Sequence, residues 1–181
     1  MAEDILENQL FEIIENEDML DNIKLAKIEM LITLGVNVDA REKFNYRTAL
    51  MVASWEGNKD IVKMLIDNGA SLDVRDGRLG DSALTLASKR GNKEVVELLL
   101  LSGADINLTN DKGQNALNAA KDEETKNVIF DVIKKMPSIK LDDEKKRMEK
   151  AIIEKIRKQE DKESMKDAKE IEKLIFSRGR F

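Results

Sequence analysis

Three consecutive carboxylates, at Asp122, Glu123 and Glu124, are the side chains in this sequence that most resemble a reactive group. Paired carboxylates can exchange protons, and carboxylates can also ligate a metal ion. The chain contains no histidine and no cysteine, so it lacks the commonest general base, the commonest metal ligand and any thiol nucleophile. We therefore interpret the three carboxylates as solubilising surface in a connecting loop, and we predict no catalytic or metal-binding residues.

Other reactive patterns are also missing from the sequence. Residues 76–82, which read DGRLGDS, contain two glycines, but their spacing does not match a phosphate-binding loop. No serine has a histidine to activate it. We expect no cofactor and no enzymatic activity.

The length and composition fit one domain, or one domain with an appendage. The chain has 181 residues, of which 41% are hydrophobic and 37% are charged. No apolar run approaches the roughly 18 residues that a membrane span needs. The N-terminus lacks the basic region of a signal peptide. We expect a cytoplasmic protein with no membrane contact.

Charge is distributed unevenly along the chain. Residues 1–21 carry eight acidic and no basic side chains, residues 22–137 carry 17 of each sign, and residues 138–181 carry 14 basic and 11 acidic side chains. The acidic start and the basic end could attract each other or a partner, or they could simply be solvated helix surfaces. Basic and acidic residues alternate in the last segment, and no aromatic residue precedes Phe176, so we do not expect nucleic-acid binding.

Two central segments of the chain repeat each other at a spacing of 34 residues. Gly-Asn-Lys recurs at Gly57 and Gly91, and Gly-Ala recurs at Gly69 and Gly103. A fixed period of this length is the signature of a solenoid. Each copy shows apolar residues at helical spacing, and each first helix is preceded by a residue that favours the N-cap position, namely Thr48, Ser82 and Asn115.

These copies resemble the ankyrin repeat, whose pattern includes Thr-Pro-Leu-His-x-Ala-Ala, Ile-Val-x-x-Leu-Leu and Gly-Ala-Asp-x-Asn. Residues 48–53 read TALMVA, residues 61–66 read IVKMLI and residues 103–107 read GADIN. The resemblance covers roughly residues 5–135 and is strongest in the two central copies. It implies an all-α fold, an ankyrin-like α-solenoid of stacked helix-turn-helix repeats with a helical C-terminal extension. The predicted repeat stack is residues 1–137, with units at about 1–41, 42–75, 76–109 and 110–137, and the charged helical extension is residues 138–181.

The sequence departs from the family pattern at several positions. The histidine that usually makes hydrogen bonds between loops is replaced by Met51, Thr85 and Asn118, so we expect those bonds to be missing and the stability to be modest. A turn glycine is replaced by Tyr46, which predicts either another backbone path or strain in that loop. In the fourth unit, Glu124 stands where the glycine between the two helices is expected.

The extension at residues 138–181 contains two apolar stripes separated by a polar stretch. The first stripe is Met148, Ile152 and Ile156, and the second is Met165, Ala168, Ile171 and Ile175. This pattern favours two short helices, or one helix with an interrupted stripe, over a continuous coiled coil. We expect the first stripe to pack on the fourth unit. The second stripe either folds back on the stack or forms an amphipathic segment for a partner or for dimerisation.

The resemblance implies that the protein binds with its loop tips and first helices on a concave face. Positions there that vary between copies, and that the fold does not dictate, are the candidates for partner binding. The predicted partner-binding residues are Phe44, Asn45, Arg47, Trp55 and Glu56 in the second unit, and Arg78, Leu79, Asp81, Lys89 and Arg90 in the third. The candidates in the fourth unit are Lys112, Gln114, Asp122 and Glu123.

Trp55, the only tryptophan, aligns with Lys89 of the next copy, so its position is not a core position. We predict that Trp55 is an exposed anchor, because aromatic and arginine side chains are enriched in interface hot spots. In the alternative interpretation, Phe44, Tyr46 and Trp55 pack on one another and cover a junction.

The sequence thus predicts a non-enzymatic protein-protein interaction module, an adaptor or inhibitor scaffold that binds a protein partner on the concave face around Trp55. The alternative is an assembly protein, a homo-oligomer that self-associates through its amphipathic basic C-terminal helices and its acidic N-terminal cap.

Overall fold

The computed structural model describes the backbone of residues 2–136 and the side chains of residues 5–136. This part of the chain contains eight helices, which are α1 (Ala2–Glu15), α2 (Asp21–Thr33), α3 (Ala49–Glu56), α4 (Lys59–Asp67), α5 (Ala83–Arg90), α6 (Lys93–Leu101), α7 (Ala116–Ala119) and α8 (Glu123–Lys135). The predicted extension at residues 138–181 and Pro137 lie outside the described residues.

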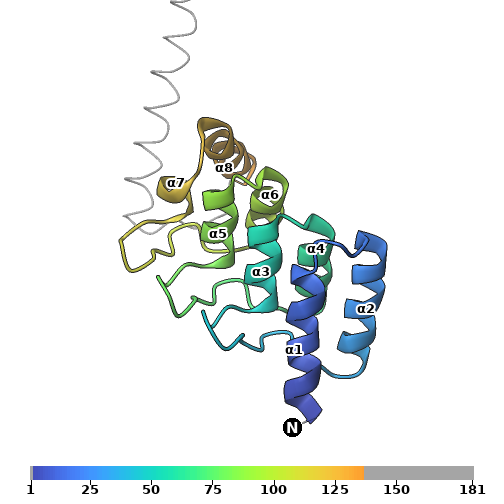
Figure 1. Cartoon of the computed structure of the whole chain (residues 1–181). Coiled ribbons are helices and arrows are strands. Elements are labelled where there is room, and N and C mark those ends of the chain that lie inside the picture. The colour runs from blue at the N-terminus through green and yellow to red at the C-terminus, as the bar shows by residue number, and fades with distance from the viewer. Residues whose placement is uncertain (1, 137–181) are drawn as a thin grey trace, which may run out of the picture. The chain divides into compact units, whose positions relative to one another are not determined.

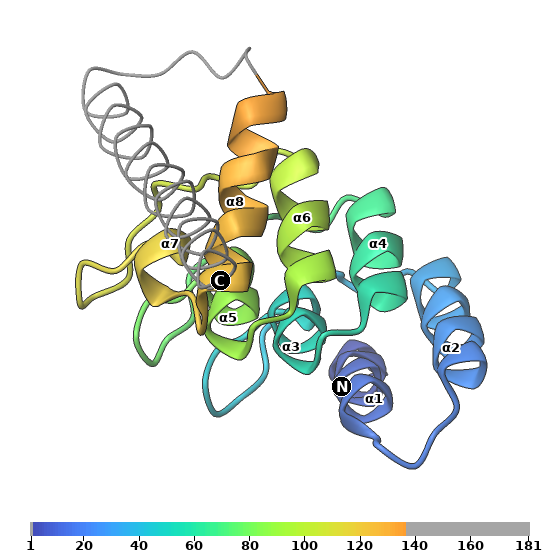
Figure 2. The same cartoon turned by 90° about the horizontal axis from the view of Figure 1, so that it is seen from above.

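The helices form two parallel rows (Figures 1 and 2). The inner row is α1, α3, α5 and α7, and the outer row is α2, α4, α6 and α8; successive members of each row contact one another. Long loops project from the inner row before α3, α5 and α7 (Figure 1). Each repeat therefore supplies one inner helix, one outer helix and one loop, which confirms the predicted all-α solenoid of helix-turn-helix units.

The predicted N-caps are confirmed at the inner helices α3, α5 and α7. The side chains of Thr48, Ser82 and Asn115 accept hydrogen bonds from the backbone N–H groups three residues later. These bonds satisfy N–H groups that have no partner within the helix. The sequence therefore determines where each inner helix begins.

The central inner helices α3 and α5 bury most of their residues, whereas outer helices bury one stripe. In α3 the buried residues run from Ala49 to Ser54, and in α5 from Ala83 to Ser88. In α4 only Ile61, Val62 and Leu65 are buried. The difference follows from position, because α3 and α5 each have a neighbouring repeat on both sides as well as their own outer helix.

The backbone at Tyr46 is strained, which is one of the two alternatives that the sequence left open for this loop. Its φ of 53° lies in the left-handed region, like the φ of 68° at Gly80 and of 70° at Gly113. The second repeat therefore keeps the family's turn instead of taking another path. A residue with a side chain costs about 1–2 kcal/mol in this conformation.

Neighbouring loops are hydrogen-bonded to each other without the family histidine. Gly77 N donates to Asn45 O at 2.8 Å, and Asp111 N donates to Leu79 O at 2.8 Å. The side chain of Arg41 adds a bond from its Nη1 to Arg75 O at 3.1 Å. Other hydrogen bonds thus connect the loops, although the bonds of the family's histidine were expected to be missing.

The fourth repeat is shortened, and one predicted position in it is wrong. The N-caps of the two helices are ten residues apart in the second repeat (Thr48 to Asn58), but seven apart in the fourth (Asn115 to Asp122). Glu124 therefore lies in the first turn of α8 and not at the turn between the helices. Asp122 to Glu124 begin a helix instead of forming a loop, a place where negative charge is favourable.

Gly57 and Gly69 offer a matched test of how closely the repeats approach. Both have left-handed φ values, 81° and 85°, but an added Cβ would lie 2.9 Å from the Asn92 side chain at Gly57 and would meet nothing within 4 Å at Gly69. We expect Gly69→Ala to lower the free energy of unfolding by about 1–2 kcal/mol. Gly57→Ala should lower it by about 1–3 kcal/mol more because of the added contact. Urea unfolding followed by circular dichroism measures both, and equal losses would show that the junction is not close-packed.

Candidate functional site

Trp55 lies at the boundary between the second and third repeats, under two arginines. The guanidinium carbon of Arg47 lies 5.3 Å from the centroid of the Trp55 ring, and that of Arg90 lies 4.9 Å from it. The ring is half-buried and packs against the hydrophobic core. Trp55 is therefore not the freely exposed anchor that the sequence predicted, and it is not fully enclosed either.

Each arginine is held by groups outside the aromatic contact. Arg47 Nε lies 3.6 Å from Oδ2 of Asp76, whose side chain is 1% exposed. Arg90 Nε donates to the backbone oxygen of Trp55 at 3.4 Å. A cation–π contact contributes from about 0.5 kcal/mol at exposed sites to about 2 kcal/mol when desolvated. The ring is thus fixed in one orientation by side chains from two successive repeats.

Asn92 secures the same junction from the third repeat. Its Nδ2 donates to the backbone oxygens of Ser54 and Trp55, each at 2.9 Å. These oxygens belong to the last turn of α3, where carbonyl groups lack a partner within the helix. The sequence shows Asn92 only as part of the recurrent Gly-Asn-Lys motif. The repeat pattern does not show which carbonyl groups its side chain reaches.

The loop tips that precede α3 and α5 carry exposed side chains. Phe44 is 91% exposed and Tyr46 is 57% exposed. Arg78 is exposed and Leu79 is half-buried at the next tip. We use the term concave face for α3, α5 and the loops at residues 36–48 and 70–82. The predicted packing of Phe44 against Trp55 is not found in the described contacts, since Phe44 is almost fully solvated.

Asp81 is buried and belongs to the scaffold, which corrects its assignment as a binding residue. Its side chain is 3% exposed and lies between two partners, Asn110 Nδ2 at 2.8 Å and Lys89 Nζ at 2.5 Å. Lys89 is half-buried and is committed to this ion pair. Asp81 therefore ties α5 to the loop of the fourth repeat, because a buried carboxylate needs such partners.

Two of the fourth-repeat candidates also have structural roles. Asp122 caps α8, and hydrogen bonds from the backbone and side chain of Thr125 lower the pKa of its carboxyl group. Gln114 N donates to Asn110 Oδ1 at 2.9 Å. Lys112 and Glu123 are exposed, and Glu123 forms an ion pair with Lys126.

Charged side chains surround Glu15 at the end of α1. Burial raises the pKa of Glu15, the charges of Glu42 and Glu56 raise it further, and Arg47 opposes them. Glu15 and Glu56 are the last residues of the inner helices α1 and α3. Arg78 and Arg90 are exposed and form no ion pair with a described residue.

No helix among residues 2–136 has both the length and the apolar character needed to cross a membrane. Within the same residues, no group of three or more side chains is arranged to hold a metal ion.

The repeats also match a known family. A family model described as ankyrin repeats (three copies) matches residues 20–110, from just before α2 to the loop before α7. The chain belongs to the ankyrin repeat family. No curated protein matches the sequence. Ankyrin repeats generally mediate protein-protein interactions, and proteins built from them are typically non-enzymatic interaction modules.

The half-buried position of Trp55 predicts an intermediate effect of its removal. We expect Trp55→Ala to lower the free energy of unfolding by about 1–2 kcal/mol, below the loss of a fully buried aromatic side chain. Phe44→Ala should change it by less than about 0.5 kcal/mol, because Phe44 is solvated. Thermal and urea unfolding by circular dichroism tests both. A loss of about 4 kcal/mol for Trp55→Ala would mean that the ring is a core element.

Glu15 should make stability depend on pH. Because its folded-state pKa is raised, the folded state binds more protons than the unfolded state as pH falls through the carboxyl range. The charged Glu15 therefore disfavours folding above its folded-state pKa. We expect Glu15→Gln to raise the free energy of unfolding at pH 7 and to leave it unchanged near pH 3. Urea unfolding at both pH values measures this, and a variant less stable than the native chain at pH 7 would contradict it.

Proposed function

We propose that this ankyrin repeat protein binds a protein partner on the concave face around Trp55. The observation that carries the proposal is the half-buried Trp55 ring with Arg47 and Arg90 over it, together with the exposed side chains of the loop tips that precede α3 and α5. Of the predicted binding residues, Phe44, Asn45, Glu56, Arg78, Leu79 and Arg90 are exposed or half-buried on this face.

Fixing the ring before binding favours affinity. Association costs free energy for every side chain that it immobilises, and a side chain already held avoids that cost. Tryptophan, tyrosine and arginine dominate interface hot spots. Here Trp55 and Arg90 are held by the fold, and Phe44 adds a large apolar surface that is 91% exposed. These features support a compact anchor site with Phe44 at its edge.

The unpaired cations indicate the chemistry of the partner. Arg78, Arg90 and Lys112 are exposed on the side of the loops and α5, and none forms an ion pair with a described residue. An acidic segment with an apolar side chain would pair with the arginines and cover Phe44. Binding should weaken as salt rises, because exposed charges are screened. The identity of the partner decides whether the protein is an adaptor, which bridges two proteins, or an inhibitor, which covers a partner's own site. The cytoplasmic location stays a prediction.

The binding site can be tested with matched single variants. Native chain is used to purify its partner from a lysate of its own cells, and the dissociation constant is then measured with the purified partner. We expect Phe44→Ala and Arg78→Ala each to weaken binding by about tenfold or more. The control is Leu101→Ala, which removes a 55% exposed apolar side chain from α6 in the outer row. Equal effects of all three variants, or an effect of Leu101→Ala alone, would place the partner elsewhere.

We also propose a second function, self-association through the C-terminal extension and the N-terminal unit. Its support is the charge difference between residues 1–21 and residues 138–181, together with an apolar groove on the N-terminal unit.

A further inference from the structure

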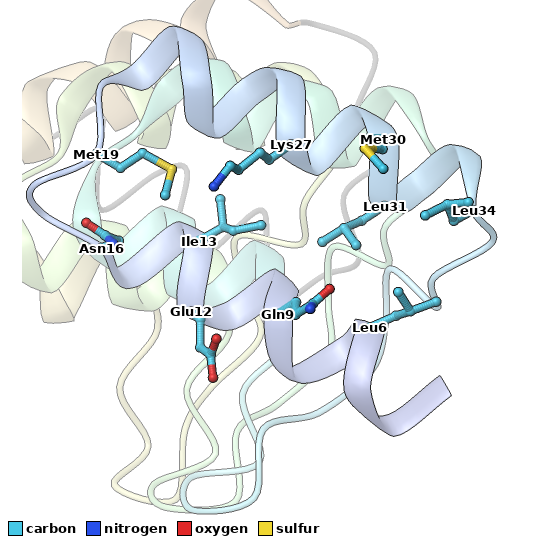
Figure 3. A pocket seen from close by; sticks show the side chains of 10 residues that line it. All are labelled: Leu6, Gln9, Glu12, Ile13, Asn16, Met19, Lys27, Met30, Leu31 and Leu34. Atoms are coloured by element: carbon cyan, nitrogen blue, oxygen red, sulfur yellow. The ribbon is translucent and has the colours of Figure 1, made fainter. Parts of the chain in front are cut away.

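The N-terminal unit contains an apolar groove between α1 and α2. The groove has a volume of about 380 Å³, and its apolar lining comes from Leu6 and Ile13 of α1, Met19 of the connecting turn, and Met30 and Leu34 at the end of α2 (Figure 3). Two charged side chains, Glu12 and Lys27, also line it. The lining side chains lie between two neighbouring helices along their length, a shape that suits another helix.

Apolar exposure in this unit is unusual for the end of a stack. Met30 is 63% exposed, Leu34 is 56% exposed and Ile5 is 59% exposed. Terminal repeats of solenoid proteins normally carry a polar outer face, because no further repeat covers them. The buried side of α1, formed by Leu10 and Ile14, already belongs to the core. The groove is therefore a second apolar surface of α1 and α2, and no described residue covers it.

We propose that residues 145–158 of a second copy of this chain dock in the groove between α1 and α2, in place of the packing on the fourth unit that the sequence pattern alone predicts. This inference rests on the proposed self-association and assigns its two surfaces. Met148, Ile152 and Ile156 recur every four residues, the spacing at which one face of a helix presents anchors to a groove.

Charge selects this segment over the other apolar stripe of the extension. Residues 145–158, KKRMEKAIIEKIRK, carry seven basic and two acidic side chains, a net charge of +5. Residues 165–176, MKDAKEIEKLIF, carry three of each sign and have no net charge. Residues 1–21, which include α1, carry eight acidic and no basic side chains. Only the first stripe thus combines helical apolar spacing with a charge opposite to that of α1.

Chain length favours a second copy over the same chain. The groove belongs to the first unit, whereas the described chain ends after α8 in the fourth, with α4 and α6 between α2 and α8. Helices pack about 8–10 Å apart, so three such steps cover about 24–30 Å. The nine residue steps from residue 136 to residue 145 span at most about 30–32 Å when fully extended. Docking within the same chain would use nearly all of this length in a straight line, whereas a second copy has no such limit.

Full-length variants test the two surfaces separately. We expect light scattering at low salt to show association of the native chain that weakens as salt rises. Met30→Lys in the groove and Ile152→Lys in the segment should each weaken association by about tenfold or more. Leu101→Lys, a matched change at a 55% exposed apolar residue of α6, should associate like the native chain. An equimolar mixture of Met30→Lys and Ile152→Lys should regain a complex, because each variant supplies the surface that the other lacks.

Each other outcome overturns a defined part of the inference. A native chain that stays monomeric at every salt concentration overturns the self-association as well as the groove. Association that survives Met30→Lys overturns the groove alone, and association that survives Ile152→Lys overturns the assigned segment. Association that is lost in Phe44→Ala, which leaves the groove intact, would place the second copy on the concave face instead.

Discussion

The central inner helices of this protein, α3 and α5, each need a repeat on both sides to cover them. In α3 the six residues from Ala49 to Ser54 are buried, because α1 and α5 pack on opposite sides and α4 packs behind. A single repeat would leave much of this surface in water, and only stacking buries it. The side chain of Asn92 reaches across the junction to two carbonyl groups of α3, which requires the absence of a side chain at Gly57. The close contact between repeats therefore supports the core and the ends of the inner helices together.

The candidate binding site is a product of the same stacking. Arg47 comes from the second repeat and Arg90 from the third, and both lie over Trp55. If the third repeat separated from the second, Trp55 would lose one arginine and the bonds from Asn92. The loops are connected in the same way, through backbone bonds such as Gly77 N to Asn45 O. Binding on this face and stability of the junction are thus physically linked.

The parts of the fold that depend on nearby residues could be predicted from the sequence. Helix positions and N-caps at Thr48, Ser82 and Asn115 follow from local patterns, and the burial of α3 and α5 follows from the repeat. The burial of Asp81 could not be predicted, because its partner Asn110 lies 29 residues away. The half-buried state of Trp55 likewise depends on Arg90, 35 residues later. The shortness of α7 was not predicted. Glu124 was placed between the two helices on the assumption that the fourth repeat is as long as the others, but this repeat is shortened before Asp122. The roles of the binding residues and the boundary at residue 137 stay predictions.

The side-chain indole of Trp55 provides the most direct measurement of where a partner binds. Because the chain contains one tryptophan, a two-dimensional NMR spectrum of the ¹⁵N-labelled protein shows a single indole N–H signal that needs no assignment. A purified partner bound on the concave face should shift this signal, together with backbone amide signals of α3, α5 and the loop at residues 36–48. An unchanged indole signal, with shifts confined to α4, α6 and α8 of the outer row, would contradict the proposed site.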